Sequence, residues 1–302
     1  MTLRESRFML WAVFTLIAAA AQTARNAMQR ELTATLGTVG ATHVRFLFGF
    51  PFALIFLAGV LIATESSLPN PPLKFWPWVL DGALAQIAAT ALMLAAMGER
   101  SFVVAIAYIK TEPVQVALFG LIFLHDALTP TLGAAVIIAT AGVIVMSLKP
   151  GAASAMSMRP TIYGLVGGTM FALSAIGYRG AILSLQLPNF VVAATFTLAV
   201  GLVLQAALLS AYLALRDMEV LRAIMRAWKP SMLAGFMGAF ASQFWFLAFA
   251  IATAASVRTL ALVEVLMAQA VSKFIFKQPA TPREVVGIVL VVIGVVLLVS
   301  GI

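Results

Sequence analysis

The chain has 302 residues, of which 63% are hydrophobic and 10% are charged, and its mean hydropathy is +1.06. Soluble domains contain about 45–50% apolar and about 25% charged residues, so this composition excludes both a soluble globular protein and a disordered one. The net charge of +8 does not indicate a nucleic-acid partner, because basic residues of membrane proteins collect in cytoplasmic loops.

The sequence contains ten apolar stretches, each long enough to cross a bilayer core that needs about 20 residues per helix. In chain order they span residues 8–24, 40–63, 76–97, 102–124, 131–148, 161–182, 189–213, 231–252, 255–276 and 284–301. Most of the short segments between them contain Gly, Pro or charged residues, which are typical of turns. We therefore expect an all-α integral membrane protein with ten transmembrane helices.

The two halves of the chain, residues 1–150 and 151–302, align without a gap when one is shifted by 152 residues. Rare residue types coincide in this alignment: Trp76 with Trp228, Glu112 with Glu264, and Pro130 with Pro282. Because five helices are an odd number, the second half must enter the membrane from the opposite side. The sequence thus predicts two inverted five-helix repeats around a central cavity, an architecture found in many secondary transporters.

Basic residues are distributed unevenly between loops that the repeat relates. The predicted loop after the first segment carries Arg25 and Arg30, and loop 214–230 carries four basic residues, whereas their repeat mates carry few. Positive-inside sorting requires such a difference for oppositely oriented halves. Taken literally, the charge bias places both termini outside the cytoplasm.

A local motif lies at the end of the fourth segment. It consists of Thr111-Glu112-Pro113-Val114, followed by Gly120-Leu121-Ile122-Phe123-Leu124-His125-Asp126-Ala127-Leu128-Thr129-Pro130, with an echo in Phe274-Ile275-Phe276-Lys277-Gln278 and Pro282. In these residues and in its ten-helix pattern the chain resembles the drug/metabolite transporter superfamily, in its EamA-like branch. The second half departs from the motif at Val265, which replaces Pro113.

This resemblance implies a secondary transporter of the inner membrane that exports amino acids or related small metabolites by alternating access. The implied partners are a small-molecule substrate, the lipid bilayer and, as a candidate coupling ion, the proton; the oligomeric state stays open between monomer and homodimer. Members of the family place both termini in the cytoplasm, which is opposite to the charge bias, so the absolute orientation also stays open.

Charged side chains inside membrane segments are costly and are therefore functional candidates. Glu112 is the first candidate and its repeat mate Glu264 the second, because a carboxylate near the midplane could bind a substrate ammonium or carry a proton. The structural alternative is an ion pair, of Glu112 with Lys110 or an Arg, and of Glu264 with Arg258 or Lys273. Lys110, on the opposite side of the fourth segment, could accept a substrate carboxylate.

Other polar and aromatic side chains share helical faces with these groups or lie on segments that should surround the cavity. Pro113 directly after Glu112 predicts a kink in the fourth segment. The residues expected to shape the cavity are Tyr108, Gln22, Asn26, Gln86, Tyr178 and Gln243. The alternative for each of them is packing between helices or contact with lipid.

The chain contains no cysteine, which excludes a disulfide framework and thiolate metal sites, and its two histidines are too few for a histidine-rich metal site. Nucleotide-binding, serine-hydrolase and zinc-protease motifs are also missing from the sequence. We therefore expect no enzyme, no cofactor and no metal. The alternatives left open are a broad exporter of cationic drugs, an uncoupled facilitator, a membrane scaffold and an intramembrane enzyme.

Overall fold

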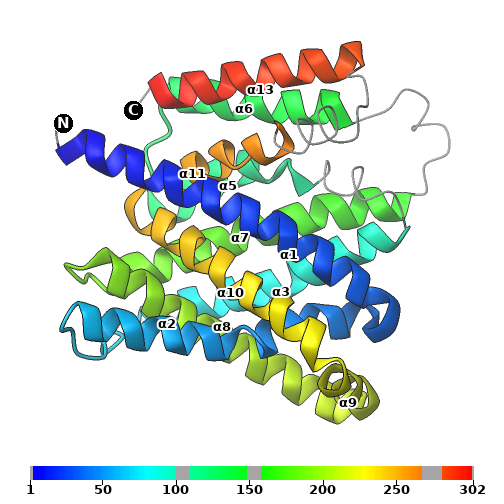
Figure 1. Cartoon of the computed structure of the whole chain (residues 1–302). Coiled ribbons are helices and arrows are strands. Elements are labelled where there is room, and N and C mark those ends of the chain that lie inside the picture. The colour runs from blue at the N-terminus through cyan, green and yellow to red at the C-terminus, as the bar shows by residue number, and fades with distance from the viewer. Residues whose placement is uncertain (1–2, 100–108, 148–157, 267–280, 301–302) are drawn as a thin grey trace.

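A computed structural model describes residues 3–99, 109–147, 158–266 and 281–300, and these contain helices but no strand (Figure 1). The helices are α1 (Leu3–Leu47), α2 (Phe50–Ala63), α3 (Phe75–Glu99), α5 (Glu112–Leu124), α6 (Pro130–Ser147), α7 (Met158–Ser184), α8 (Phe190–Arg216), α9 (Met218–Arg226), α10 (Trp228–Ile251), α11 (Ala254–Leu260) and α13 (Pro282–Ser300). The all-α prediction is confirmed for this part of the chain.

Six segments of the described residues are long and apolar enough to cross a membrane, and the shorter helices α5 and α6 are apolar too. Large apolar side chains such as Ile55, Ile137 and Val296 are exposed on the outside of the bundle. Such a surface is stable against lipid chains, whereas a water-exposed surface would be polar. The chain is a multi-pass membrane protein. The predicted segments 102–124 and 255–276 extend into residues outside the described ranges.

The predicted loop between the first two segments is wrong. The chain is helical from Leu3 to Leu47, apart from Gly37, whose φ of 66° and ψ of 176° are accessible only to glycine. The chain reverses direction at Gly37. In a straight helix Gln29 and Ala41, 12 residues apart, would be separated by about 18 Å, but here Gln29 Nε2 donates a hydrogen bond to the carbonyl of Ala41 over 2.9 Å.

The buried position of Arg25 also corrects the distribution of basic residues between the predicted loops. Arg25, counted above as a loop charge, is completely buried within α1. The polar stretch around it was interpreted as a loop because polarity usually indicates contact with water, but here the polar side chains face the interior of the bundle. Arg25 therefore gives no information on which side of the membrane the segment lies.

The fourth and ninth predicted segments are broken helices. Lys110 and Thr111 form a turn, and α5 begins at Glu112; α11 ends at Leu260, and Ala261 and Leu262 form the corresponding turn. Pro113 explains the first break, since proline lacks the N–H that would continue the ladder. The second half has no proline at this position. Broken helices are tolerated at membrane depth where protein groups or a cavity supply partners for the backbone.

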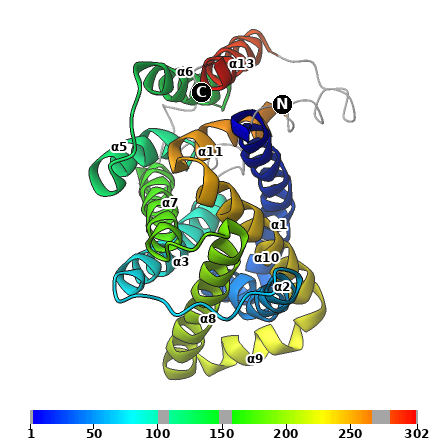
Figure 2. The same cartoon turned by 90° about the vertical axis from the view of Figure 1, so that its left-hand side faces the viewer.

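The predicted loop 214–230 contains a short amphipathic helix, α9, which lies across one end of the bundle between α8 and α10 (Figure 2). Asp217 caps it, because its Oδ1 accepts from the backbone N–H of Val220 over 3.3 Å. Ile224 is buried while Glu219 and Arg222 are exposed. This division is typical of a helix that lies in the plane of the membrane surface.

The most extensive contacts between helices are those of α3 with α7, α1 with α10, and α6 with α13. Figures 1 and 2 both show α6 and α13 side by side at one end of the molecule. Under the 152-residue shift α1 corresponds to α7 and α3 to α10. The shift therefore converts the α3–α7 contact into the α1–α10 contact. The third pair, α6 with α13, corresponds to itself. The three largest helix contacts are therefore unchanged as a set when the two halves are exchanged.

The crossing of α6 and α13 depends on glycines, and this gives a first testable prediction. A Cβ at Gly142 would lie 2.7 Å from the carbonyl oxygen of Gly287 and 2.8 Å from the backbone nitrogen of Val291. We expect Gly142→Ala to lower the stability by about 1–3 kcal/mol, because the helices must move apart. The measurement is the melting temperature in detergent. Gly133→Ala in the same helix is the control, since nothing lies within 4 Å of its Cβ; equal melting temperatures for the two variants would contradict the crossing.

Candidate functional site

Two ion pairs connect the two halves of the chain at the helix breaks. Lys110 Nζ contacts Glu264 Oε1, and Arg258 Nε lies 3.0 Å from Glu112 Oε1. All four side chains are at most 11% exposed. The breaks bring these groups together because they place α11 against α5. Glu112 therefore has an arginine partner, as the structural alternative expected, whereas Glu264 pairs with Lys110 and not with Arg258.

Arg258 has further contacts that hold it in place. Its guanidinium carbon lies 4.4 Å from the ring centre of Trp245 and 5.4 Å from that of Phe249, which are cation–π distances. Its Nε and Glu112 Oε1 are close but not aligned as a hydrogen bond. The pair is therefore held mainly by charge and by the aromatic rings, which leaves hydrogen-bonding capacity on both partners.

A small closed cavity of about 10 Å³, with room for about one water molecule, lies beside Arg258. Its lining comes from α1, α3, α7, α10 and α11: Gln22, Arg45, Gln86, Phe171, Ser174, Ala175, Tyr178, Ser242, Trp245, Phe246, Phe249 and Arg258. We call this the buried cavity. Three residues that the sequence singled out, Gln22, Gln86 and Tyr178, meet in it.

The polar groups of the buried cavity are held by neighbours. Trp245 Nε1 donates to Gln22 Oε1 over 3.0 Å, and Gln205 Nε2 donates to Gln86 Oε1 over 3.0 Å. The ring of Tyr178 packs at 4.5 Å on that of Phe246. Such contacts fix the rotamers of the lining, so a ligand would meet groups that are already oriented.

Two further arginines, Arg25 and Arg45, are completely buried near these ion pairs and the buried cavity. Arg45 donates from Nη1 to Thr90 Oγ1 over 3.3 Å and from Nη2 to Ser242 Oγ over 3.1 Å. Arg25 donates from Nη2 to Asn26 Oδ1 over 2.6 Å. Asn26, another residue that the sequence singled out, therefore acts here as an acceptor for arginine.

Two of the predicted cavity residues lie elsewhere. Gln243 Nε2 donates to Thr195 Oγ1 over 2.7 Å, and Gln243 does not line the buried cavity. Tyr108 lies outside the described residues. The sequence reasoning also missed Arg45 and Arg258 as site residues, although the rule that identified Glu112, a charge inside an apolar segment, applies equally to them.

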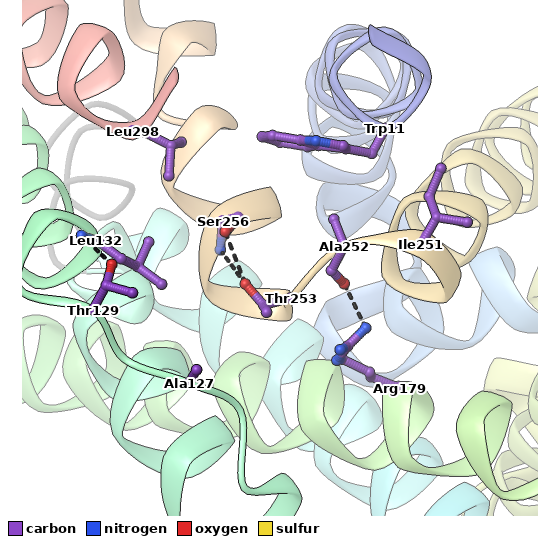
Figure 3. A pocket seen from close by; sticks show the side chains of 10 residues that line it. All are labelled: Trp11, Ala127, Thr129, Leu132, Arg179, Ile251, Ala252, Thr253, Ser256 and Leu298. Carbon is purple, nitrogen blue, oxygen red and sulfur yellow. Dashed lines mark hydrogen bonds between the residues drawn. The ribbon is translucent and has the colours of Figure 1, made fainter. Parts of the chain in front are cut away.

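A second, wider pocket of about 480 Å³ opens on the other side of α11 (Figure 3). Its lining contains Trp11, Ala127, Thr129, Leu132, Arg179, Ile251, Ala252, Thr253, Ser256 and Leu298. Ser256 lines this wide pocket, whereas Arg258, two residues further along α11, lines the buried cavity. α11 therefore contributes side chains to both spaces.

Arg179 forms the floor of the wide pocket. It is paired with Asp126, whose Oδ1 lies 3.1 Å from Nη2, and Nη1 donates to the carbonyl oxygens of Phe249 and Ala252. These carbonyls end α10 just before the chain enters α11. Arg179 thus connects the end of α10 to α7.

Comparison with known proteins agrees with this architecture. Residues 9–148 match the model of the EamA-like transporter family. A solved structure, described only as "Crystal structure of protein", aligns with a TM-score of 0.68 and 14% identity over 97% of each chain; it is one of 27 matching chains. At this identity the likeness concerns the fold alone. The comparison with curated proteins gives no significant match. The first half of this multi-pass membrane protein therefore carries an EamA-like transporter domain.

Proposed function

We propose that the whole chain is a secondary transporter of the inner membrane, which exports amino acids or related small metabolites by alternating access. The observation that carries this proposal is the pairing of α5 and α11 at two interrupted helices, where two ion pairs join one half of the chain to the other and Arg258 of one pair also lines the buried cavity. Discontinuous helices at the interface between repeats are a recurrent way to build a transport site.

The mechanism follows from this arrangement. The buried cavity is too small for an organic substrate in this conformation, while the wide pocket beyond α11 has room for one. Movement of α11 relative to α5 would join the two spaces and would stretch the contact between Arg258 and Glu112. In our proposal the halves move as inverted repeats, and the two ion pairs hold the closed state.

A broad exporter of cationic drugs is the weaker candidate. Its cavity would need an available carboxylate, but both buried carboxylates already have cationic partners. A scaffold would need neither a buried cavity nor charges that connect the halves. An intramembrane enzyme would need a paired nucleophile and base, and the described cavity contains no such pair.

The experiment that tests the proposal is flux of labelled amino acids and organic acids in proteoliposomes, with and without a pH gradient. We expect saturable flux by the wild type, and a dependence on the gradient if protons are coupled. Gln86→Leu should reduce the flux about tenfold, which corresponds to one lost hydrogen bond of about 1.4 kcal/mol.

Gln243→Leu is the matched control, because Gln243 is also a membrane glutamine but lies outside the buried cavity. Its flux should equal that of the wild type when the amount of folded protein is equal. Equal losses in both variants would contradict the placement of the site, and no saturable flux of any offered solute would contradict the function.

A further inference from the structure

The buried cluster carries more positive than negative charge. Four cations, Arg25, Arg45, Lys110 and Arg258, accompany only two carboxylates, Glu112 and Glu264. The charges of Arg45, Arg258 and Glu264 all act on Arg25, so these groups form one electrostatic unit. Lys110 and Arg258 each form an ion pair with one carboxylate, whereas Arg25 and Arg45 form no ion pair with a described side chain.

The rest of the sequence does not supply a carboxylate that forms an ion pair with Arg25 or Arg45. The segments outside the described residues contain neither Asp nor Glu. Glu5 precedes Arg25 by 20 residues, about 30 Å along a helix, and Glu99 follows Thr90, the partner of Arg45, by nine residues, about 14 Å. An unpaired charge in a membrane interior costs several kcal/mol and therefore calls for a ligand or a function.

Several donor atoms of these arginines also lack hydrogen-bond partners. Arg25 Nε and Nη1 and Arg45 Nε are buried and have no hydrogen-bond partner among the described residues, and neither has Ser174 Oγ in the lining of the buried cavity. Buried polar groups normally have partners. The two arginines lie together against α10, since a Cβ at Gly238 would be 2.9 Å from Arg45 Cγ and 3.5 Å from Arg25 Cδ.

We propose that Arg25 and Arg45 bind the carboxylate or phosphate group of a small organic anion with net negative charge, which is the transported substrate. This inference rests on the proposed function and narrows its substrate class. A guanidinium presents donors in a fork that matches carboxylate and phosphate oxygens. The anion supplies the charge that the cluster lacks, and the hydroxyl of Ser174 adds a donor.

The aromatic part of the lining has a separate role. Tyr178, Trp245 and Phe246 contribute aromatic rings to the lining of the buried cavity. These rings contact the carbon part of the substrate once the cavity has opened, while the arginines hold its charged end. An inorganic ion would use only the arginines, so it binds more weakly than an organic anion of the same charge.

The test compares the melting temperature of the purified protein with succinate, glycerol 3-phosphate, inorganic phosphate, leucine and tetraphenylphosphonium. We expect a rise of about 5 °C with succinate or glycerol 3-phosphate near 100 times its dissociation constant. A larger effect of succinate assigns a carboxylate, and a larger effect of glycerol 3-phosphate assigns a phosphate. No rise with leucine or tetraphenylphosphonium is expected.

Two variants separate binding from structure. Arg25→Met should leave the protein without ligand at least as stable as the wild type, because it removes an unpaired buried charge, and should remove the shift with the anion. Arg45→Gln should raise the dissociation constant of the same anion at least about tenfold. Arg216→Gln, at the exposed end of α8, is the control and should keep the full shift.

Three results would overturn the inference. If the Arg25→Met protein has a lower melting temperature than the wild type but keeps the shift with the anion, Arg25 has a structural role and does not bind the anion. Wild-type flux of neutral amino acids or cations without any response to the anions would reject the substrate class and leave the proposed function standing. No flux of any solute together with no shift would reject both.

Discussion

A Glu112→Gln protein is expected to lose transport and about 3–5 kcal/mol of stability. The change leaves the guanidinium of Arg258 buried without an opposite charge, and breaking one side of a buried ion pair has this cost. Arg258 Nε lies 3.0 Å from Glu112 Oε1, and both side chains are less than 10% exposed. Thermal unfolding in detergent measures the loss of stability, and flux in proteoliposomes measures the loss of transport.

The double variant Glu112→Gln/Arg258→Met separates the two effects. It removes both charges, so its stability should return most of the way to the wild-type value, while transport stays absent. Glu219→Gln is the control for an exposed pair, because Glu219 and Arg222 are 70% and 60% exposed; its cost should be below about 1 kcal/mol. A single Glu112→Gln variant as stable as the wild type would contradict the ion pair.

Reversal of the second ion pair is expected to have a comparable effect. Lys110→Glu places a carboxylate against that of Glu264 in a site where both side chains are at most 11% exposed. Like charges in contact away from water cost several kcal/mol, so we expect little folded protein. The measurement is the yield of monodisperse protein in size-exclusion chromatography.

The double reversal Lys110→Glu/Glu264→Lys restores opposite charges and should recover a substantial part of this yield. Glu264→Lys alone should fail as Lys110→Glu does. If the double variant folded no better than either single variant, the two residues would not be partners. If both single variants folded normally, the contact between the halves would not contribute to the closed state.

The fold was predictable where hydropathy decides it. The apolar stretches of α3, α7, α8 and α10 were found from the sequence because their length matches the bilayer. The predicted loop after residue 24 failed for a physical reason: the polar residues around Arg25 are buried, and a sequence does not say whether a polar group faces water or a protein interior. The reversal at Gly37 likewise depends on a backbone conformation that glycine permits but does not require.

The site was predictable only in part. Charge inside an apolar segment identified Glu112, Glu264 and Lys110 as important, but not their partners, because pairing depends on how α5 and α11 cross. The same rule would have identified Arg45, which lies inside predicted segment 40–63 and lines the buried cavity. The sequence could not show that Gln86 lines the buried cavity and Gln243 does not. Both are single amide side chains in apolar helices, and they differ only in the side of the helix that faces the cavity.

In the proposed mechanism the buried cavity becomes open to each side of the membrane in turn. The chain has no cysteine, so Ser242→Cys places a single thiol in the lining of the buried cavity. The measurement is its labelling by a membrane-impermeant thiol reagent in right-side-out and inside-out vesicles. Ala248→Cys, buried in the same helix but outside both pockets, is the control. We expect Ser242→Cys to be labelled from both sides and Ala248→Cys from neither; labelling of Ser242→Cys from one side only, or from none, would contradict alternating access through this site.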